Sequence, residues 1–594
     1  MRERIIADQT GEIMKVGASY YPELLDATEW ERDLAAGREI GLSSLRCGEF
    51  AWSALSPKPG AWDVGWALRF LDVAARHGYE VIWCTPSATP PPYLFNRWPD
   101  LHAFNIDDRW VPLGVRRQYC PSHGAYIDIC EQTAEHLAQD LGGHPALAGW
   151  QVDNEIAGDG FTCWCPRCGV KFQQWLRERY VSLDHLNELW QTGVWSQVYT
   201  DWEQIPIPHR CWAHAPAIKL DFRRFRSDNW LRFYRAQYRA LRGGGARRVT
   251  TNFYNLTWDV PFDQWAWRQN LDAIGVSHYL EEEIASHFQL ALLQGASPGE
   301  KPLWVLEQKA GQQAAQNLYP EDLFRIENHL RICADHGAEY AIYWHLRQHS
   351  AGCEMEHGAV LRHDGKPGRI ARAIQLAIAV TENLTPHVPA ADSLLVFSFQ
   401  QHWANENRPQ PGSRWSYREE IEQSWYGGAR DALAGIRVGG LSDIGQSHRL
   451  ILAPFLQLDE PEMMDRIWNA FEAGATVVTT VDLARLDDQN NVRRIAPLGS
   501  LAPRIDAPAL EVLHLKEGFK VHGQIGVHAI HGRHFWAIPD GPLETGRMGW
   551  LGTEDCVGPA ALRFKVGQGS LVVALSALDR AGVAALITEI RGEE

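Results

Sequence analysis

The chain is 594 residues long and carries 57 basic against 73 acidic residues, which gives a formal net charge of −16 at pH 7. This length predicts more than one domain and a large buried core. An acidic chain repels a phosphate backbone, so we expect no nucleic-acid partner. Trp occurs 26 times, and its flat apolar face suits both the stacking of sugar rings and the filling of a core.

The first residues, MRERIIADQTGEIMKVGASYYP, hold charges but neither an apolar segment nor a small-residue cleavage site. They therefore predict no secretory signal. No run of about 18 apolar residues occurs, so we expect no membrane partner. The cysteines number eleven, and an odd number in a large chain without a signal indicates the reducing cytoplasm.

Short apolar runs alternate with segments of helical periodicity over the first part of the chain. The segment 66–78, WALRFLDVAARHG, is typical of a helix that ends at a glycine. The apolar runs predict eight strands, at 14–22, 42–50, 79–87, 147–155, 249–256, 271–280, 302–308 and 338–348. Eight such units predict a (β/α)8 TIM barrel, with an open doubly wound sheet as the alternative. Polar residues collect at the strand ends: Arg46, Glu49, Asp153, Asn154, Glu155, Glu307, Gln308, Arg347 and Gln348.

A break at 383–392, NLTPHVPAAD, is followed by a second alternating α/β pattern. The helical segment 463–474 lies among buried parallel strands predicted at 393–400, 449–456, 475–481 and 570–576. We therefore expect a catalytic barrel at 1–385 and a smaller, open α/β domain at 390–594. The chain contains no GxGxxG and no GxxxxGK[ST], so we predict no nucleotide-phosphate cradle.

Two glutamates end predicted barrel strands, Glu155 the fourth and Glu307 the seventh. In such barrels the functional residues collect at the C-terminal ends of strands. Glycosidic hydrolysis with retention needs two carboxyl groups at the anomeric centre, one as nucleophile and one as acid/base. Asn154 can hydrogen-bond a sugar 2-OH, a contact that strengthens in the transition state. The alternative is that each glutamate is a solvated loop residue.

At these positions the sequence resembles glycoside hydrolase family 42, the β-galactosidases, whose catalytic glutamates end strands 4 and 7. Nine motifs carry the resemblance, among them ASYYPE at 18–23, RCGEFAWSALSP at 46–57, TPSATPPPYL at 85–94, GWQVDNE at 149–155 and LEQKAG at 306–311. The resemblance implies that Glu155 is the acid/base and Glu307 the nucleophile. It also implies a retaining exo-β-galactosidase that removes terminal β-D-galactosyl residues from small galactosides.

The resemblance further implies which residues bind the substrate. Glu354 and His357 keep the Glu-x-x-His spacing of a pair that grips hydroxyls of the galactosyl ring. The implied set is Arg116 and Asn154 for the galactose hydroxyls, Trp195 for the wall of the −1 subsite, Tyr279 beside the nucleophile, and Glu354 with His357.

Some positions depart from the family pattern. Ala315 stands where the family usually has a Trp that completes the galactose pocket, with Tyr319 as a nearby substitute. His278 and the sequence of the eighth strand, at 338–348, are also unusual for the family. These departures keep two alternatives open. One is the same mechanism acting on α-L-arabinopyranosides or β-D-fucosides, and the other is a catalytically idle sugar-binding or assembly protein.

Three closely spaced thiols, Cys163, Cys165 and Cys168, suit a tetrahedral metal ion. Cys120, which follows the third predicted strand, is the candidate for a fourth ligand. The family resemblance supports a zinc site at these four residues. A closed site of four thiolates has no open coordination position, so the zinc would be structural and the chemistry needs no cofactor. Reduced thiols without metal are the alternative.

The second domain resembles the family's α/β domain, which is like that of glutamine amidotransferases but lacks their catalytic Cys. The resemblance implies a homotrimer. The chain stops soon after the strand-then-helix pattern at 564–590. We therefore expect the family's small C-terminal β domain to be absent or vestigial.

Overall fold

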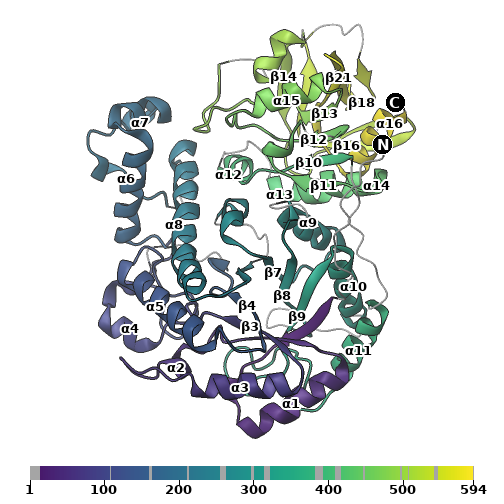
Figure 1. The fold of residues 1–594 in the computed structure, drawn as a ribbon. Helices are drawn as coiled ribbons and strands as arrows, with labels where there is room; N and C mark the ends of the chain where they lie inside the picture. The colour runs from purple at the N-terminus through teal and green to yellow at the C-terminus, as the bar shows by residue number, and fades with distance from the viewer. Residues whose placement is uncertain are drawn as a thin grey trace, which may run out of the picture. The chain divides into compact units, whose positions relative to one another are not determined.

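The structure is a computed structural model, shown in Figure 1. It describes residues 14–592 except 108, 159–162, 210–212, 255–261, 296–299, 313–321, 382–391, 408–415, 446–447, 495–497, 506 and 541–545. Contacts divide the chain into two compact units. The first consists of Met1–Cys168 with Asp228–Val388, and the second of Gly169–Ser227 with Pro389–Glu594.

The first unit is built on a parallel sheet that closes into a barrel, and its strands occur where the apolar runs predict them. They are β1 (Lys15–Ser19), β2 (Ser44–Cys47), β3 (Glu80–Cys84), β4 (Leu147–Gln151), β5 (Val249–Thr250), β6 (Asn252–Phe253), β7 (Ile274–His278), β8 (Leu303–Lys309) and β9 (Ala338–Trp344). Their order is β5-β4-β3-β2-β1-β9-β8-β7-β6. Because β5 and β6 are consecutive and separated only by Thr251, the sheet path returns to its start. The predicted TIM barrel is confirmed.

Helices alternate with these strands, as a barrel of parallel strands requires. In helix α1, capping residues determine where the helix begins and a glycine determines where it ends. The Glu29 side chain accepts from the Asp26 backbone N–H at its start, and Gly41 ends it with a φ of 105° that favours glycine. The helices are α1 (Ala27–Ile40), α2 (Trp52–Leu55), α3 (Gly65–Arg76), α4 (Pro92–Arg97), α5 (Gly124–Leu141), α8 (Pro216–Gly243), α9 (Glu283–Gln294), α10 (Asp322–Asp335) and α11 (Arg369–Thr381).

A bulge in β8 sets the orientation of the residues at its C-terminal end. Trp304 and Leu306 belong to a small buried cluster, and the pairing of β8 with β9 shifts register between Val305 and Gln308. Gln308 contacts Cys333 on α10, whereas its neighbour Glu307 contacts strands β2 and β6 across the barrel. The bulge thus turns Glu307 toward the barrel mouth, a common use of bulges beside active sites.

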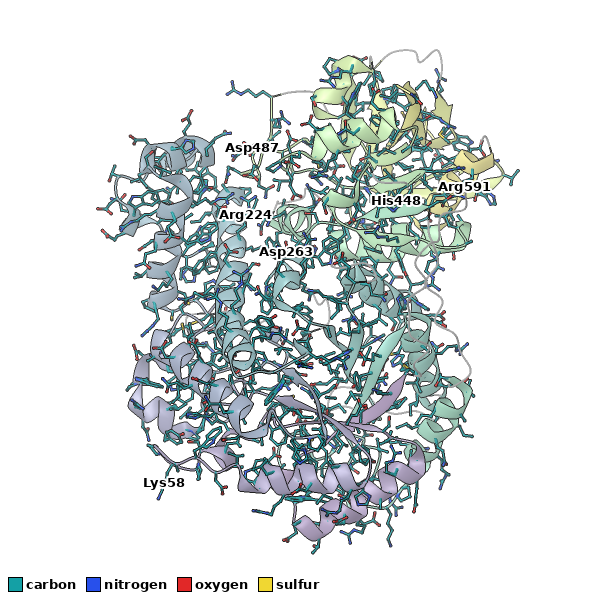
Figure 2. All side chains as sticks on the ribbon, viewed as in Figure 1. Lys58, Arg224, Asp263, His448, Asp487 and Arg591 are labelled. Atoms are coloured by element: carbon teal, nitrogen blue, oxygen red, sulfur yellow. The ribbon has the colours of Figure 1, made fainter. Side chains whose placement is uncertain are left out.

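The second unit contains a helical segment from the long insertion after β4. This segment includes most of α6 (Pro166–Tyr180), all of α7 (Leu183–Trp190) and the start of α8. Arg224 on α8 lies beside the loop that carries Asp487 (Figure 2), and its Nη2 is 2.9 Å from Asp488 Oδ1. Buried Asp221 accepts from Arg224 at 3.0 Å. Polar contacts therefore tie this segment to the C-terminal part of the same unit.

The second unit also contains the open α/β sheet that the apolar runs predict, which confirms a second open-sheet domain. Its order is β11-β10-β12-β13-β21-β20-β17, and the pairs from β11 to β21 are parallel. The strands are β10 (Ser393–Val396), β11 (Arg437–Gly439), β12 (Leu450–Ala453), β13 (Thr476–Thr480), β17 (Arg547–Met548), β20 (Ala561–Val566) and β21 (Gly569–Ala574). The helices are α12 (Phe399–Asn407), α13 (Tyr417–Glu419), α14 (Gly427–Ala432), α15 (Met463–Glu472) and α16 (Arg580–Gly592).

A third, antiparallel sheet was not anticipated from the sequence. Its order is β14-β16-β15-β18-β19, with β22 paired to β16. These strands are β14 (Leu510–His514), β15 (Val521–Ile525), β16 (His528–Pro539), β18 (Trp550–Gly552), β19 (Val557–Gly558) and β22 (Ser576–Leu578). Their half-exposed faces give no continuous apolar run, which is the signal that revealed the parallel strands. Across the described parts of both units, no helix has the length and apolar character needed to cross a membrane.

Candidate active site

Glu155 is held in a strained turn just after β4. Asp153 and Glu155 have φ values of 59° and 48°, which residues other than glycine adopt only when their surroundings enforce it. Buried Asp153 accepts from the Tyr119 hydroxyl at 3.0 Å. The Glu155 N–H donates to Asn252 Oδ1 at 2.9 Å, and its Oε2 accepts from Arg117 at 2.7 Å. The turn therefore fixes Glu155 in both backbone and side chain.

Glu307 is 4% exposed and three donors surround its carboxylate. Oε1 accepts from Asn252 Nδ2 at 3.1 Å and lies 3.0 Å from Arg46 Nη2. Oε2 accepts from the Tyr279 hydroxyl at 3.0 Å. These donors stabilise the negative charge that the carboxylate carries when it is ionised.

The side-chain amide of Asn252 connects the two glutamates, since its Oδ1 binds Glu155 and its Nδ2 binds Glu307. The same Nδ2 donates to Asn154 Oδ1 at 2.9 Å, and Arg46 donates to that oxygen at 2.6 Å. Asn154 Nδ2 is buried and has no hydrogen-bond partner among the described residues. A buried donor left unpaired is costly, so this amide is available to an oxygen acceptor of a bound molecule.

The pKa values of Glu307 and of its hydrogen-bond partner Tyr279 are both raised. Burial first, and then the charge of Glu155, raise the pKa of Glu307, while Arg46 and Arg116 oppose the rise. Burial and the charge of Glu307 raise the pKa of Tyr279 well above its usual range. The phenol therefore keeps its proton and donates it in the hydrogen bond to the carboxylate.

Glu354 and His357 lie in the same electrostatic neighbourhood. The His357 ring is 8% exposed, packs edge-on against Trp344 with centroids 5.0 Å apart, and has no hydrogen-bond partner in the described parts of the chain. Burial raises the pKa of Glu354, and the charges of Arg116 and Glu155 act on it in opposite directions. Arg116 thus acts on the pKa of both residues, and Glu155 acts on that of Glu354.

Of the other predicted site residues, Arg116 lies near Glu155, and Trp195 lies in the second unit. Arg116 is about one-third exposed, and its Nη2 is 3.6 Å from Glu155 Oε2. Trp195 belongs to the second unit, in a short 3-10 turn, and is 69% exposed. Ala315 and Tyr319 lie outside the described residues.

Three site residues had no assigned role from the sequence: Arg46, Arg117 and Asn252. Arg46 was visible only as a polar strand end, and Arg117 only as the neighbour of Arg116. Asn252 interrupts the predicted fifth strand, and a polar residue inside an apolar run was the available signal for it. Its partners are distant in sequence, so only the closed barrel reveals what it contacts.

Four buried cysteines form a second site. Within the first unit, the sulfur atoms of Cys120, Cys163, Cys165 and Cys168 all lie within 4.8 Å of one another. Cys120 Sγ is 3.5 Å from Cys165 Sγ and 3.6 Å from Cys168 Sγ, well beyond the ~2.05 Å of a disulfide. A tetrahedron with Zn–S bonds of ~2.3 Å has sulfur–sulfur edges of about 3.8 Å. The cluster therefore fits a tetrahedral metal ion.

Two family models match the chain. The one described as beta-galactosidase matches residues 19–384, and the one described as the beta-galactosidase trimerisation domain matches residues 391–594. A β-galactosidase of a Thermus species is 34% identical over 430 residues, which are 68% of this chain and 65% of that protein. A β-galactosidase of Halorubrum lacusprofundi is 28% identical over 523 residues, 83% of this chain and 73% of that protein. The chain thus spans somewhat less than two thirds of the length of the Thermus relative.

Solved structures show the same fold. The β-galactosidase of Halorubrum lacusprofundi superposes with a TM-score of 0.90 at 25% identity, covering 98% of this chain and 89% of that one. The β-galactosidase of Bacillus circulans sp. alkalophilus gives a TM-score of 0.90 at 22% identity, covering 98% and 88%. With a family model matched over most of its length, the chain belongs to the β-galactosidases of glycoside hydrolase family 42.

Proposed function

We propose that the chain is a retaining exo-β-galactosidase in which Glu307 is the nucleophile and Glu155 the acid/base. The observation that carries this proposal is the bridge through Asn252, whose amide binds both glutamates. One amide thereby binds two glutamates that are 152 positions apart in the sequence, Glu155 through its backbone N–H and Glu307 through its carboxylate. A pair of carboxyl groups at one centre is what double displacement requires.

The surroundings of each glutamate favour these roles. Glu307 accepts from Asn252 and Tyr279 and lies against Arg46, which suits a carboxylate that must attack while ionised. Glu155 follows Asn154 directly, and the free Nδ2 of Asn154 is a donor for the 2-OH of the sugar. Glu354 and His357 offer an acceptor and unpartnered ring nitrogens to further hydroxyls of the ring.

The reaction then proceeds in two displacements. Glu155 donates its proton to the leaving oxygen while Glu307 attacks the anomeric carbon, which breaks the glycosidic bond and forms a glycosyl ester. Water takes the place of the leaving group, Glu155 removes a proton from it, and the resulting attack releases galactose and the Glu307 carboxylate. The two inversions give net retention.

A panel of nitrophenyl glycosides tests the proposal: β-galactoside, α-L-arabinopyranoside, β-D-fucoside and β-glucoside, with the first-formed sugar followed by NMR. We expect the fastest turnover on the β-galactoside and β-galactose as the first product. Silence on all four substrates, or first release of the α-anomer, would contradict it. As a control, Glu155→Ala is expected to retain activity on good leaving groups, and added azide is expected to give β-galactosyl azide.

We further propose that the cysteine cluster holds a structural zinc ion. Cys120, Cys163, Cys165 and Cys168 would bind it, and the metal would pin the segment after Glu155 to the segment after β3. Four thiolates leave no open coordination position, so the metal supplies stability and takes no part in hydrolysis. Ten free cysteines among the described residues favour the reducing cytoplasm as the location.

The domain organisation is also proposed. The two family matches, at 19–384 and 391–594, support a catalytic domain at 1–385 and an assembly domain at 390–594. The description of the second match as a trimerisation domain supports a homotrimer. Light scattering of the purified chain tests this, and a monomeric mass at micromolar concentration would contradict it.

A further inference from the structure

A row of buried polar contacts runs from the C-terminal end of β9 to Glu307, and Glu49 lies in the middle of it. The Trp344 indole N–H donates to the Tyr21 hydroxyl at 2.7 Å. That hydroxyl donates to Glu49 Oε1 at 2.8 Å, and Arg46 Nη1 donates to the same oxygen at 2.9 Å. The other end of the guanidinium, Nη2, lies 3.0 Å from Glu307 Oε1. Only the side chain of Arg46 thus separates Glu49 from the proposed nucleophile.

The backbone after β2 places Glu49 for this contact. Gly48 has a φ of 94°, a conformation that favours glycine, and a Cβ at this position would lie 2.8 Å from Trp83 Nε1. The turn brings the carboxylate of Glu49 back to Arg46, three residues earlier. Both side chains are completely buried, so water screens this ion pair much less than it would a pair on the surface.

Each nitrogen of the Arg46 guanidinium has an acceptor. Among the acceptors that the described residues offer, the carboxylates of Glu49 and Glu307 are the charged ones. The neutral acceptors are Ser19 Oγ at 3.1 Å, Gln151 Oε1 at 2.7 Å and Asn154 Oδ1 at 2.6 Å. When Glu307 carries no charge, Glu49 is therefore the counter-ion that remains in contact with Arg46.

The charge of Glu49 acts on the proposed nucleophile. Burial first, and then Glu155, raise the pKa of Glu307; Arg46 and Arg116 lower this pKa, and Glu49 raises it again. Burial opposes the charged form of Arg46, but Glu49 first among its neighbours, and Glu307 after it, raise the pKa of Arg46 well above its usual range. One permanent cation is therefore shared by two carboxylates. The other ionisable groups that interact electrostatically with these carboxylates are Tyr21, Glu23, Cys47, Cys84, Tyr279 and Glu354.

We propose that Glu49 is a positioning residue for the nucleophile: it fixes Arg46 against Glu307 and shares the charge of the guanidinium, while Tyr21 holds Glu49 in place. Within the proposed function, on which this role rests, Glu307 attacks as a carboxylate and is a neutral ester in the intermediate. The ester no longer balances Arg46, and a buried cation without a partner is strongly destabilising. Glu49 keeps the guanidinium paired through both displacements.

The experiment compares the pH profiles of kcat/KM on the nitrophenyl β-galactoside for the wild type, Glu49→Gln and Tyr21→Phe. Glutamine can still accept from both partners but carries no charge, so Arg46 lowers the pKa of Glu307 without an opposing carboxylate. Because the nucleophile must be ionised, we expect the acidic limb of Glu49→Gln to move to lower pH by about one unit.

Tyr21→Phe is expected to move the same limb in the opposite direction. The phenyl ring keeps the stacking on Phe50 but no longer donates to Glu49. The negative charge of Glu49 then acts more strongly on Glu307, so the limb should move to higher pH by about half a unit. A general loosening of the fold would lower the rates of both variants without moving their limbs in opposite directions.

Glu422→Gln is the matched control, because Glu422 is also a buried partner of an arginine, Arg418, but lies in the second unit. Its limb is expected at the wild-type position. A limb of Glu49→Gln that stays in place or moves to higher pH would overturn the assignment of Glu49. If Glu49→Gln does not fold, Tyr21→Phe decides, and an unmoved limb or one at lower pH overturns it. Inactivity of the wild type on every nitrophenyl glycoside would instead refute the proposed function, and the role of Glu49 with it.

Discussion

Asn252 Nδ2 lies 3.1 Å from Oε1 of Glu307, and the other end of the same amide holds the backbone of Glu155. The barrel closes at this point, since Asn252 begins β6 and the neighbouring β5 pairs with β4. Closure of the barrel and alignment of the two glutamates are therefore one structural event. The proposed mechanism needs the glutamate after β4 and the glutamate on β8 at one centre, and this relationship accounts for how the fold relates them.

Removing the bridge tests its role. In Asn252→Ala, Glu307 keeps Arg46 and Tyr279 but loses the contact that relates it to Glu155. We expect kcat/KM on the β-galactoside to fall about 100-fold, or ~2.7 kcal/mol, as measured by initial rates. Asn491→Ala, in the second unit, is the control and is expected to retain wild-type rates. A loss of less than threefold in Asn252→Ala would show that the bridge is dispensable.

Tyr279→Phe tests the hydrogen bond on the other side of the nucleophile. The phenol stabilises the ionised form of Glu307, so its removal raises the pKa of that carboxyl further above its usual range. Because the nucleophile must be ionised, the acidic limb of the kcat/KM profile should move to higher pH by about one unit. A pH–rate profile measures the shift, and a limb that stays in place or moves to lower pH speaks against this contact.

Glu307→Gln is expected to stabilise the protein, and more so as the pH rises. The pKa of Glu307 is raised from its ordinary 4.5 to about 8 in the folded chain, chiefly by burial. Between these values the unfolded state loses the proton that the folded state keeps, so wild-type stability falls with rising pH. Glutamine does not titrate. The difference in Tm between variant and wild type should therefore grow from about pH 4.5 to pH 8, and calorimetry at several pH values measures it. A constant difference would contradict this account.

The zinc proposal is tested by metal analysis and by removal of a ligand. We expect about one zinc per chain, and Cys168→Ser is expected to lose it and to lower the Tm by about 5 °C or more. The control is Cys353→Ser, since Cys353 is exposed and outside the cluster. A wild-type protein that is purified from zinc-containing medium without metal, with an unchanged Tm in Cys168→Ser, would favour the alternative of free thiols.

The substitution Asp221→Ala tests how much the buried ion pair with Arg224 stabilises the helical segment of the second unit. Its carboxylate is fully buried and accepts from Arg224, Tyr180 and Trp190. Asp221→Ala leaves buried Arg224 partly uncompensated, so we expect a loss of about 3 kcal/mol in the stability of the unit. Urea unfolding followed by tryptophan fluorescence measures it. Exposed Glu178→Ala is the control, and equal behaviour of the two variants would mean that the ion pair contributes little.

The sequence predicts the barrel because most of its parallel strands are buried on both faces and lie in short, largely apolar segments that alternate with helical ones. It also predicts Glu155 and Glu307, since both stand at strand ends. It does not predict Arg46, Arg117 or Asn252 as site residues, because their partners lie far away in the chain. The antiparallel sheet is not predicted, because β14 and β15 are largely exposed or half-exposed and give no continuous apolar run.

The central claim is that Glu307 forms the covalent intermediate. A 2-deoxy-2-fluoro-β-galactoside with a dinitrophenyl leaving group slows the second displacement more than it slows the departure of the phenol, so the glycosyl-enzyme accumulates. Peptide mapping by mass spectrometry then locates the sugar. The account predicts one sugar per chain, attached to Glu307 and missing in Glu307→Gln. A sugar on Glu155 or Glu354, or turnover in Glu307→Gln at the wild-type rate, would contradict it.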